Sequence, residues 1–162
     1  MVVSHPDAAF MSRAIELAHD GAVAGDYRLG ALVVGTDGAL AEAYTDLEAT
    51  GDPTAHAEVV AIRRAAARVG SRYLAGCYLY TTLEPCPMCT AAAIWAKMAG
   101  IVFGAALEDA LERGGEWRDG EFFSWRQIRV KARYVVERGT PLLELHEGFM
   151  RTECLALLPG PG

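Results

Sequence analysis

The sequence predicts an α/β protein built as a three-layer α/β/α sandwich with a central mixed sheet. Short apolar, β-branched runs alternate along the chain with segments in which apolar residues recur at helical spacing. No internal repeat and no low-complexity linker interrupts the 162 residues. A chain of this length, with 52% apolar residues, can bury one sizeable core. We therefore expect residues 1–162 to form a single domain.

The chain begins with a predicted helix and a predicted hairpin. From Asp7 to about Val23 the apolar residues keep helical spacing, and Pro6 stands where the first turn of a helix tolerates proline. The runs LGALVVG and LAEAY follow. They are joined by a turn at Asp37 and Gly38, which is typical of a β-hairpin.

The middle of the chain continues the alternation of helix and strand. Thr54 is expected to cap a helix that runs to Arg68, and Gly70 follows where such a helix stops. The run GCYLYTT predicts a short buried strand. The segment EPCPMCTAAAIWAKMAG predicts a helix that is entered through a rigid proline turn and closes at Gly100. The run IVFGA then predicts another strand.

The pattern weakens after Ala105. The segment LEDALERGGEWRDGEFFSWRQI predicts a short helix followed by a Gly-rich aromatic loop over residues 115–127. This loop either closes over a pocket or docks on a partner subunit. The run RYVVE predicts a strand, and a final helix is expected from about Leu142 to Leu157. The aromatic residues of the loop are Trp117, Phe122, Phe123 and Trp125.

The composition excludes several classes of protein. The net charge is −6 and no Lys/Arg cluster is present, whereas nucleic-acid binders need a basic surface for phosphates. Small neutral or weakly charged substrates fit better. The sequence shows no signal-peptide pattern and no run of about 18 apolar residues that would suggest a membrane span. We expect a soluble, cytoplasmic protein.

Two of the four cysteines lie at metal-ligand spacing. Cys86 and Cys89 are three residues apart at the start of a predicted helix, so their side chains share one face, and the helix dipole there lowers thiolate pKa values. His56, near the start of the preceding predicted helix, can supply an imidazole. Two sulfur ligands and one nitrogen suit zinc and leave the fourth tetrahedral position to water. Alone, the cysteine pair would equally indicate a redox pair or a disulfide.

Glu58, two residues after His56, would lie beside the same ion. A carboxylate there can take a proton from zinc-bound water, whose pKa is about 7, and pass it on. The alternative is a solvated carboxylate in the first helical turn, which would favour the helix dipole by ~1 kcal/mol at most.

The pattern His-Ala-Glu at 56–58 followed by Pro-Cys-x-x-Cys at 85–89 is typical of zinc nucleobase deaminases. By these motifs the chain resembles the cytidine-deaminase-like superfamily over roughly residues 10 to 110. The resemblance implies that His56, Cys86 and Cys89 bind zinc and that Glu58 is the catalytic acid and base. The segments DPTAHAEVVAIR, EPCPMC and IWAK are most similar to bacterial guanine deaminases. Bacterial tRNA adenosine deaminases share the first and second motifs.

The resemblance to guanine deaminases also implies substrate contacts. Trp95 and Asp109 match contact positions, and Ala57 is included among the expected substrate-binding residues. Trp95 lies on an apolar helix, which favours a place in the core over a ligand contact, and a surface carboxylate is the alternative for Asp109. Asp46 or Thr45 stands where related enzymes commonly have an Asn that contacts the base or sugar. A carboxylate there would favour a ligand edge rich in donors.

The activity implied by the resemblance is zinc-dependent hydrolytic deamination of an exocyclic amine on a nucleobase or nucleoside, with guanine to xanthine as the leading case. Cytosine-like, modified-base and s-triazine substrates are the alternative. A tRNA adenosine deaminase, disfavoured by the acidic composition, and a non-catalytic zinc-binding module rank lower. The resemblance further implies a homodimer, in which a C-terminal helix at 141–158 is exchanged or packed at the interface.

Overall fold

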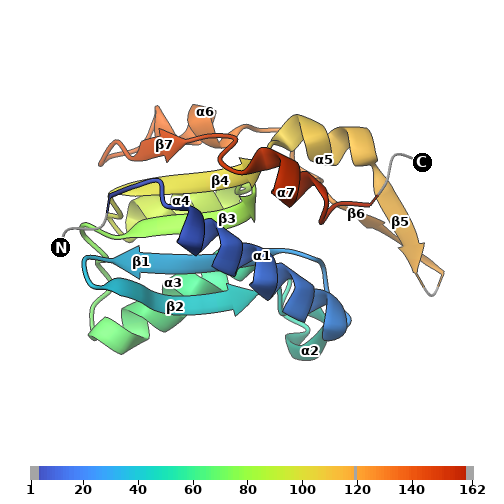
Figure 1. Cartoon of the computed structure of the whole chain (residues 1–162), viewed down its shortest axis with the longest axis horizontal. Helices are drawn as coiled ribbons and strands as arrows, with labels where there is room; N and C mark the ends of the chain where they lie inside the picture. Colours follow the sequence, from blue (N-terminus) through green and yellow to red (C-terminus); the bar gives the residue numbers. More distant parts are fainter. Residues whose placement is uncertain (1–3, 119, 160–162) are drawn as a thin grey trace.

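The computed structural model describes residues 4–118 and 120–159, and for 116–118 and 121–123 it describes the backbone alone. Figure 1 shows a five-stranded sheet with the strand order β2-β1-β3-β4-β7 and a separate two-stranded hairpin. The elements in chain order are α1 (Ala8–Val23), β1 (Gly30–Gly35), β2 (Gly38–Tyr44), α2 (Leu47–Thr50), α3 (Ala57–Val69), β3 (Tyr78–Leu83), α4 (Pro87–Trp95), β4 (Gly100–Ala105), α5 (Leu107–Arg113), β5 (Gly115–Arg118), β6 (Glu121–Ser124), α6 (Ala132–Val136), β7 (Glu144–His146) and α7 (Arg151–Leu155).

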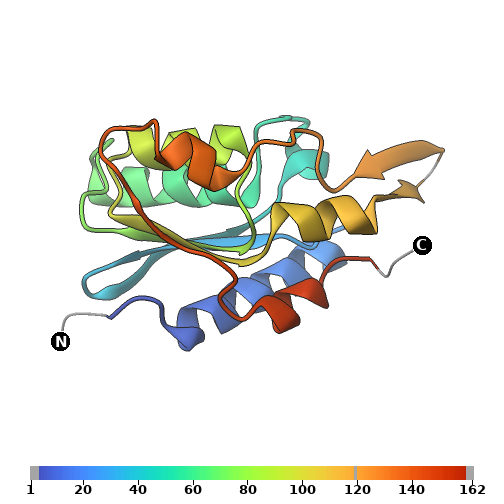
Figure 2. The same ribbon diagram turned by 90° about the horizontal axis from the view of Figure 1, so that it is seen from above.

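The sheet is mixed and lies between two helical layers, which confirms the predicted fold class. Strand β1 runs antiparallel to β2 and β3, whereas β3, β4 and β7 are parallel. Figure 2 shows α1 and α7 on one face of the sheet and α3, α4 and α6 on the other. All six residues of β1 are buried because both faces are covered. None of the helices in the described part of the chain is long and apolar enough to span a membrane.

The side chains of β1 supply both halves of the core. Ala31 and Val33 pack in the apolar cluster that contains α3 and α4. Leu32 and Val34 join the cluster that contains α1 and α7. This alternation follows from the two-residue period of a strand.

The start of α3 differs from the prediction. The helix begins at Ala57, with His56 as its N-cap, and not after Thr54. Thr54 closes a tight turn, in which the Asp52 carboxylate accepts hydrogen bonds from its N–H at 2.8 Å and from its hydroxyl at 2.7 Å. The prediction of a Thr54 cap was wrong because residues 52–55 form a turn, closed by the Ala55 N–H on the carbonyl of Asp52 at 3.0 Å, and the helical backbone starts only at Ala57. The same turn leads the chain directly into His56.

Two predictions for the segment after α5 were also wrong. The run RYVVE (residues 133–137), predicted as a strand, lies mostly in helix α6 (Ala132–Val136), because Ala132 and Val136 lie one helical turn apart and both pack into the core. The predicted loop begins with the β5–β6 hairpin, which extends away from the sheet (Figure 1). The side chains of Trp117, Phe122 and Phe123 lie outside the part of the chain that the structure describes.

The helix predicted from Leu142 to Leu157 is a short strand followed by a short helix. Strand β7 forms because the edge of β4 accepts it in parallel register. Gly148 and Met150 then adopt positive φ angles of 70° and 53°, which interrupts a helix before α7 starts. Helix α7 lies so close to β4 that a side chain on Gly104 would collide with Cys154 Sγ.

Candidate metal centre and active site

Two helix starts meet beside the end of β3. His56 is the N-cap of α3 and Cys86 is the N-cap of α4, and neither side chain makes a capping hydrogen bond. Both side chains are therefore available to a ligand. Pro87 in the first turn of α4 presets the helical backbone after Cys86. Cys89, one turn further along α4, is fully buried.

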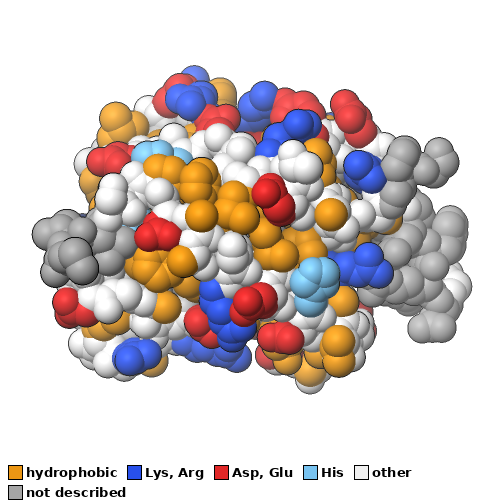
Figure 3. Space-filling view, in the orientation of Figure 1, with side chains coloured by type: hydrophobic (Ala, Val, Ile, Leu, Met, Phe, Trp, Pro, Cys, Tyr) orange, Lys and Arg blue, Asp and Glu red, His pale blue; other side chains and the backbone are white. Residues whose placement is uncertain are grey.

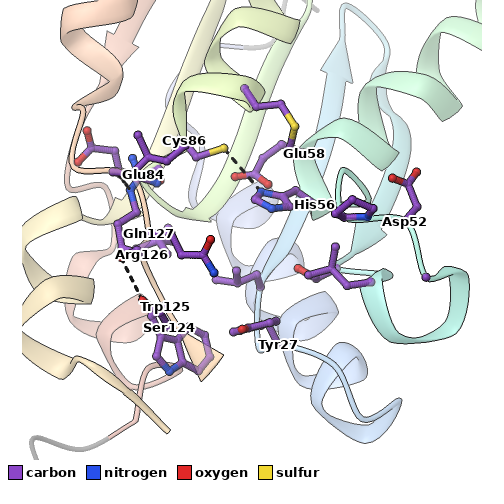
Figure 4. Close-up of a pocket in the computed structure, with 18 residues that line it drawn as sticks. Tyr27, Asp52, His56, Glu58, Glu84, Cys86, Ser124, Trp125, Arg126 and Gln127 are labelled. Carbon is purple, nitrogen blue, oxygen red and sulfur yellow. Dashed lines mark hydrogen bonds between the residues drawn. The ribbon is translucent and has the colours of Figure 1, made fainter. Parts of the chain in front are cut away.

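The imidazole of His56 and the two sulfur atoms form a compact triangle, part of which is visible in Figure 4. Its sides are 3.7 Å from Cys86 Sγ to His56 Nδ1, 3.5 Å from Cys89 Sγ to His56 Nδ1, and 3.5 Å between the sulfurs. A tetrahedral zinc ion with Zn–S near 2.3 Å requires S···S and S···N separations of about 3.8 and about 3.6 Å. The structure therefore brings the three predicted ligands together in an arrangement that fits zinc.

The three ligand groups shift one another's protonation. The hydrogen bond from Cys89 lowers the pKa of Cys86 to about 4, and His56 contributes to the same effect. Donation to Cys86 raises the pKa of Cys89 well above its ordinary value. The hydrogen bond with Cys86 raises the pKa of His56. One thiolate thus forms readily, and a metal ion that binds both sulfurs would displace the second proton.

Glu58 faces the same space from the first turn of α3. Its side chain is only 6% exposed, and it lines one cavity together with His56 and Cys86. The hydroxyl of Thr81 donates a hydrogen bond to Glu58 Oε1 at 3.3 Å. Burial raises the pKa of Glu58. A buried carboxylate of this kind is suited to accept and return a proton.

The cavity has a volume of about 510 Å³, within the range of small-molecule sites. One wall consists of residues 124–128, so the end of the predicted aromatic loop closes over the pocket. Trp125 in this wall packs edge-on against Tyr27, with ring centroids 5.2 Å apart. The other apolar lining residues are Leu29, Leu47, Pro53, Leu83, Met88 and Ile128.

Thr45, and not Asp46, lies against the cavity. The Thr45 side chain is 1% exposed, and its hydroxyl oxygen has no hydrogen-bond partner among the described residues. Asp46 is the N-cap of the short helix α2 and lies outside the described cavity lining. A hydroxyl group therefore stands where the sequence left a hydroxyl and a carboxylate as alternatives.

The remaining expected substrate-binding residues are not brought to the cavity. Ala57 is fully buried and Asp109 is 4% exposed, and neither belongs to the described cavity lining. The Asp109 carboxylate accepts hydrogen bonds from Arg151. Trp95, at the end of α4, is 82% exposed beside a second hollow, so the favoured prediction of a place in the core was wrong. Trp95 lies on the outward face of α4, so it is exposed although the helix as a whole is apolar.

Two buried charged residues beside the metal ligands were not singled out from the sequence. Glu84 accepts hydrogen bonds at 2.7 Å from the N–H groups of Leu107 and Ala132. Arg126 donates to main-chain carbonyls, including that of Glu84. Glu84 directly precedes the Pro-Cys motif, and this position could have drawn attention to it. Arg126 gave no signal, because it is one of several basic residues in an irregular segment.

Comparison with known proteins places this site in a family. The family model "Cytidine and deoxycytidylate deaminase zinc-binding region" matches residues 4–105. Guanine deaminase of Bacillus subtilis is 42% identical over 106 residues, which cover 65% of this chain and 68% of that enzyme. The tRNA-specific adenosine deaminase of Aquifex aeolicus is 41% identical over 81 residues, covering 50% of this chain and 54% of that enzyme.

A solved structure extends the agreement to the fold. The guanine deaminase of Nitrosomonas europaea superposes with a TM-score of 0.79 at 23% identity, covering 97% of this chain and 84% of that chain. The two sequence relatives are almost equally identical to this chain, so identity does not separate a guanine from a tRNA adenosine as substrate. Zinc is the metal of the family, and His56, Cys86 and Cys89 are positioned to bind a metal ion. The chain belongs to the cytidine and deoxycytidylate deaminase family of zinc-binding deaminases.

Proposed function

We propose that this protein hydrolyses the exocyclic amine of a free nucleobase, with guanine to xanthine as the leading reaction. The observation that carries the proposal is that Glu58 and the His56–Cys86 pair face one cavity of about 510 Å³, closed on one side by residues 124–128. Its largely apolar walls suit a flat heterocycle. The similarity to the Bacillus subtilis guanine deaminase supports guanine as the base.

The chemistry follows from the groups around the cavity. Zinc, when bound by His56, Cys86 and Cys89, would supply Lewis-acid activation of water. Glu58 would accept the water proton, deliver it to the ring nitrogen beside the amine-bearing carbon, and then pass a proton to the leaving amine. One water is consumed and one ammonia is released. Thr81 orients Glu58 through its hydrogen bond to Oε1.

Cytosine-like, modified-base and s-triazine substrates remain alternatives within the same chemistry. Thr45 bears on this choice because its hydroxyl can donate or accept a hydrogen bond. Thr45 therefore does not require a ligand edge rich in hydrogen-bond donors, such as that of a triazine. The structure weakens the argument that a carboxylate at Asp46 selects such a ligand.

A tRNA adenosine deaminase is the second candidate, and the 41% identity to the Aquifex aeolicus enzyme favours it. The net charge of −6 argues the other way. On the face that carries α1 and α7, basic and acidic side chains are interspersed in the coloured part of the surface (Figure 3). The acidic composition is the feature that separates the two candidate activities, and it favours deamination of a free base over deamination of tRNA.

The test is ammonia release by the zinc-loaded protein from guanine, cytosine, adenine, their nucleosides, ammeline and a tRNA transcript. A dominant guanine rate, absent in a Glu58→Gln variant, is the expected result. A dominant rate on the transcript, lost at high salt, would replace the proposal with the tRNA activity. No release from any of these would overturn both.

We also propose that two copies of the chain associate. The exposed Trp95 and the half-exposed Tyr134 border a hollow of about 500 Å³ between α4 and α6. Exposed aromatic side chains of this kind are common at protein interfaces.

A further inference from the structure

Arg126 is a buried cation that binds only main-chain carbonyls among the described residues. The residue lies in the cavity wall, and only 8% of its surface is exposed. Its guanidinium donates at 3.0 Å to Ile128 O and at 3.1 Å to Val130 O. It also donates at 2.8 Å to Glu84 O and at 3.3 Å to Pro85 O. A buried charge without a counter-ion is costly unless it is well hydrogen-bonded, so these four bonds offset the cost of burying the guanidinium.

The carbonyls of Glu84 and Pro85 belong to the turn that delivers Cys86 to the metal triangle. The opposite side of this turn is also held, because the Glu84 carboxylate accepts the N–H groups at the starts of α5 and α6. Thr90 adds a hydroxyl bond to the carbonyl of Cys86 at 3.0 Å. The turn is thus fixed from three sides, and Arg126 supplies the side that faces the cavity.

The same guanidinium fixes the cavity wall. Its bonds to the carbonyls of Ile128 and Val130 fold the segment after Arg126 back on itself. Gln127 and Ile128 of this segment, and Trp125 just before it, line the cavity. One side chain therefore contacts both the metal-ligand turn and the substrate wall, which are about forty residues apart in the chain.

We infer that Arg126 is a positioning residue that holds Cys86 in place for zinc and couples the ligand turn to the wall at 124–128. A planar fork with five N–H donors can bridge several carbonyls at once, which an ammonium group cannot do in the same geometry. Partners in the outer shell of a metal site typically change metal affinity 10- to 100-fold when removed. The inference depends on zinc binding and not on the identity of the substrate.

The test compares Arg126→Met and Arg126→Lys with the matched control Arg113→Met. Arg113 also donates to a main-chain carbonyl, that of Pro159 at 2.9 Å, but away from the ligand turn. Two readouts are used: the rate of zinc transfer to a chromogenic chelator, and the absorption bands of the Co²⁺-substituted protein, which report the geometry at the cysteine sulfurs. Far-UV circular dichroism checks that each variant is folded.

We expect Arg126→Met to release zinc at least tenfold faster, with altered Co²⁺ bands, and Arg126→Lys to show a smaller effect in the same direction. Arg113→Met should match the wild type in both readouts. A folded Arg126→Met with the wild-type release rate and Co²⁺ spectrum would overturn the inference. If Arg126→Met does not fold, Arg126→Lys decides. A wild-type release rate and spectrum in that variant would likewise overturn the inference. Neither readout involves turnover, so a wrong substrate assignment would leave the result intact.

Discussion

Arg151 on α7 binds both carboxylate oxygens of Asp109 on α5, with 2.9 Å between Arg151 Nε and Asp109 Oδ2. Asp109 also accepts the N–H of Ala106 at 2.7 Å, so its carboxylate caps α5 while it ties α7 to the body. The residue that the sequence offered as a substrate contact is thus engaged in holding the C-terminal segment.

This ion pair predicts a pH-dependent loss of stability in Arg151→Met. Burial opposes ionisation of Asp109, but the hydrogen bonds from Arg151 and the Ala106 N–H hold its pKa below the ordinary value. The pair therefore stabilises the fold above the ordinary carboxyl pKa of about 4, and this is lost as the pH falls through the lower pKa of the folded state. Calorimetry should show a Tm lowered by a few degrees at pH 7, with the difference from wild type shrinking below about pH 4.

The control for this comparison is Arg138→Met. Arg138 stacks on the Tyr134 ring at 3.7 Å, so its removal should give a difference that does not follow the titration of Asp109. A Tm of Arg151→Met equal to that of the wild type at pH 7 would contradict the prediction.

Replacing Glu58 with Gln should abolish turnover and spare zinc. The amide keeps the size of the carboxylate but cannot accept the proton, and general acid–base groups contribute typically 10²- to 10⁴-fold. The measurement is kcat together with zinc content by elemental analysis. Glu48→Gln, an exposed carboxylate on α2, is the matched control and should keep full activity. Retention of most activity in Glu58→Gln would show that another group moves the proton.

Thr45→Val and Asp46→Asn should show which of these two residues contacts the substrate at the position where related enzymes commonly have an Asn. Thr45 lines the cavity with an unpartnered hydroxyl, whereas Asp46 lies outside the described lining. A ligand hydrogen bond to the hydroxyl is worth about 0.5–1.5 kcal/mol, so Thr45→Val should raise KM for the preferred base by up to about tenfold. Asp46→Asn should leave the ranking of substrates unchanged. The reverse pattern would reinstate the carboxylate as the residue that selects the ligand.

Removing zinc should destabilise the folded chain. A ligand present at 1,000 times its Kd contributes about 4 kcal/mol, which corresponds to a fall of about 10 °C in Tm for a chain of this size. Thermal unfolding with and without a strong chelator measures the effect. Cys89→Ala should abolish the chelator's effect, and Cys77→Ala, which changes a buried thiol outside the site, should preserve it. Equal chelator shifts in both variants would exclude the triangle as the zinc site.

Trp95→Ser should shift the chain toward the monomer. The substitution removes the largest exposed aromatic side chain beside the hollow between α4 and α6. Sedimentation velocity over a range of concentrations measures the change, with Tyr73→Ser, another exposed aromatic outside that hollow, as the control. A wild-type protein that sediments as a monomer would refute the proposed association directly.

The sequence by itself determined the alternation of helix and strand up to Ala105 and the metal-ligand set. Short-range rules account for two parts of this: Cys86 and Cys89 share a helix face because they are three residues apart, and β1 and β2 pair through a tight turn at Gly38. His56, 30 residues from Cys86, was joined to the cysteines by the motif that they share with known deaminases. The short-range rules also placed Glu58 beside His56.

Only the tertiary structure decided which distant residues complete the site. Thr45 faces the cavity and Asp46 does not. Arg126 binds the carbonyl of Glu84, about forty residues away, and the Asp109 carboxylate binds Arg151. The segments 132–136 and 144–146 took unexpected forms because α4 and the edge of β4 offered them packing and pairing partners. Contacts of this range depend on how the layers stack, and local propensity carries no information about that.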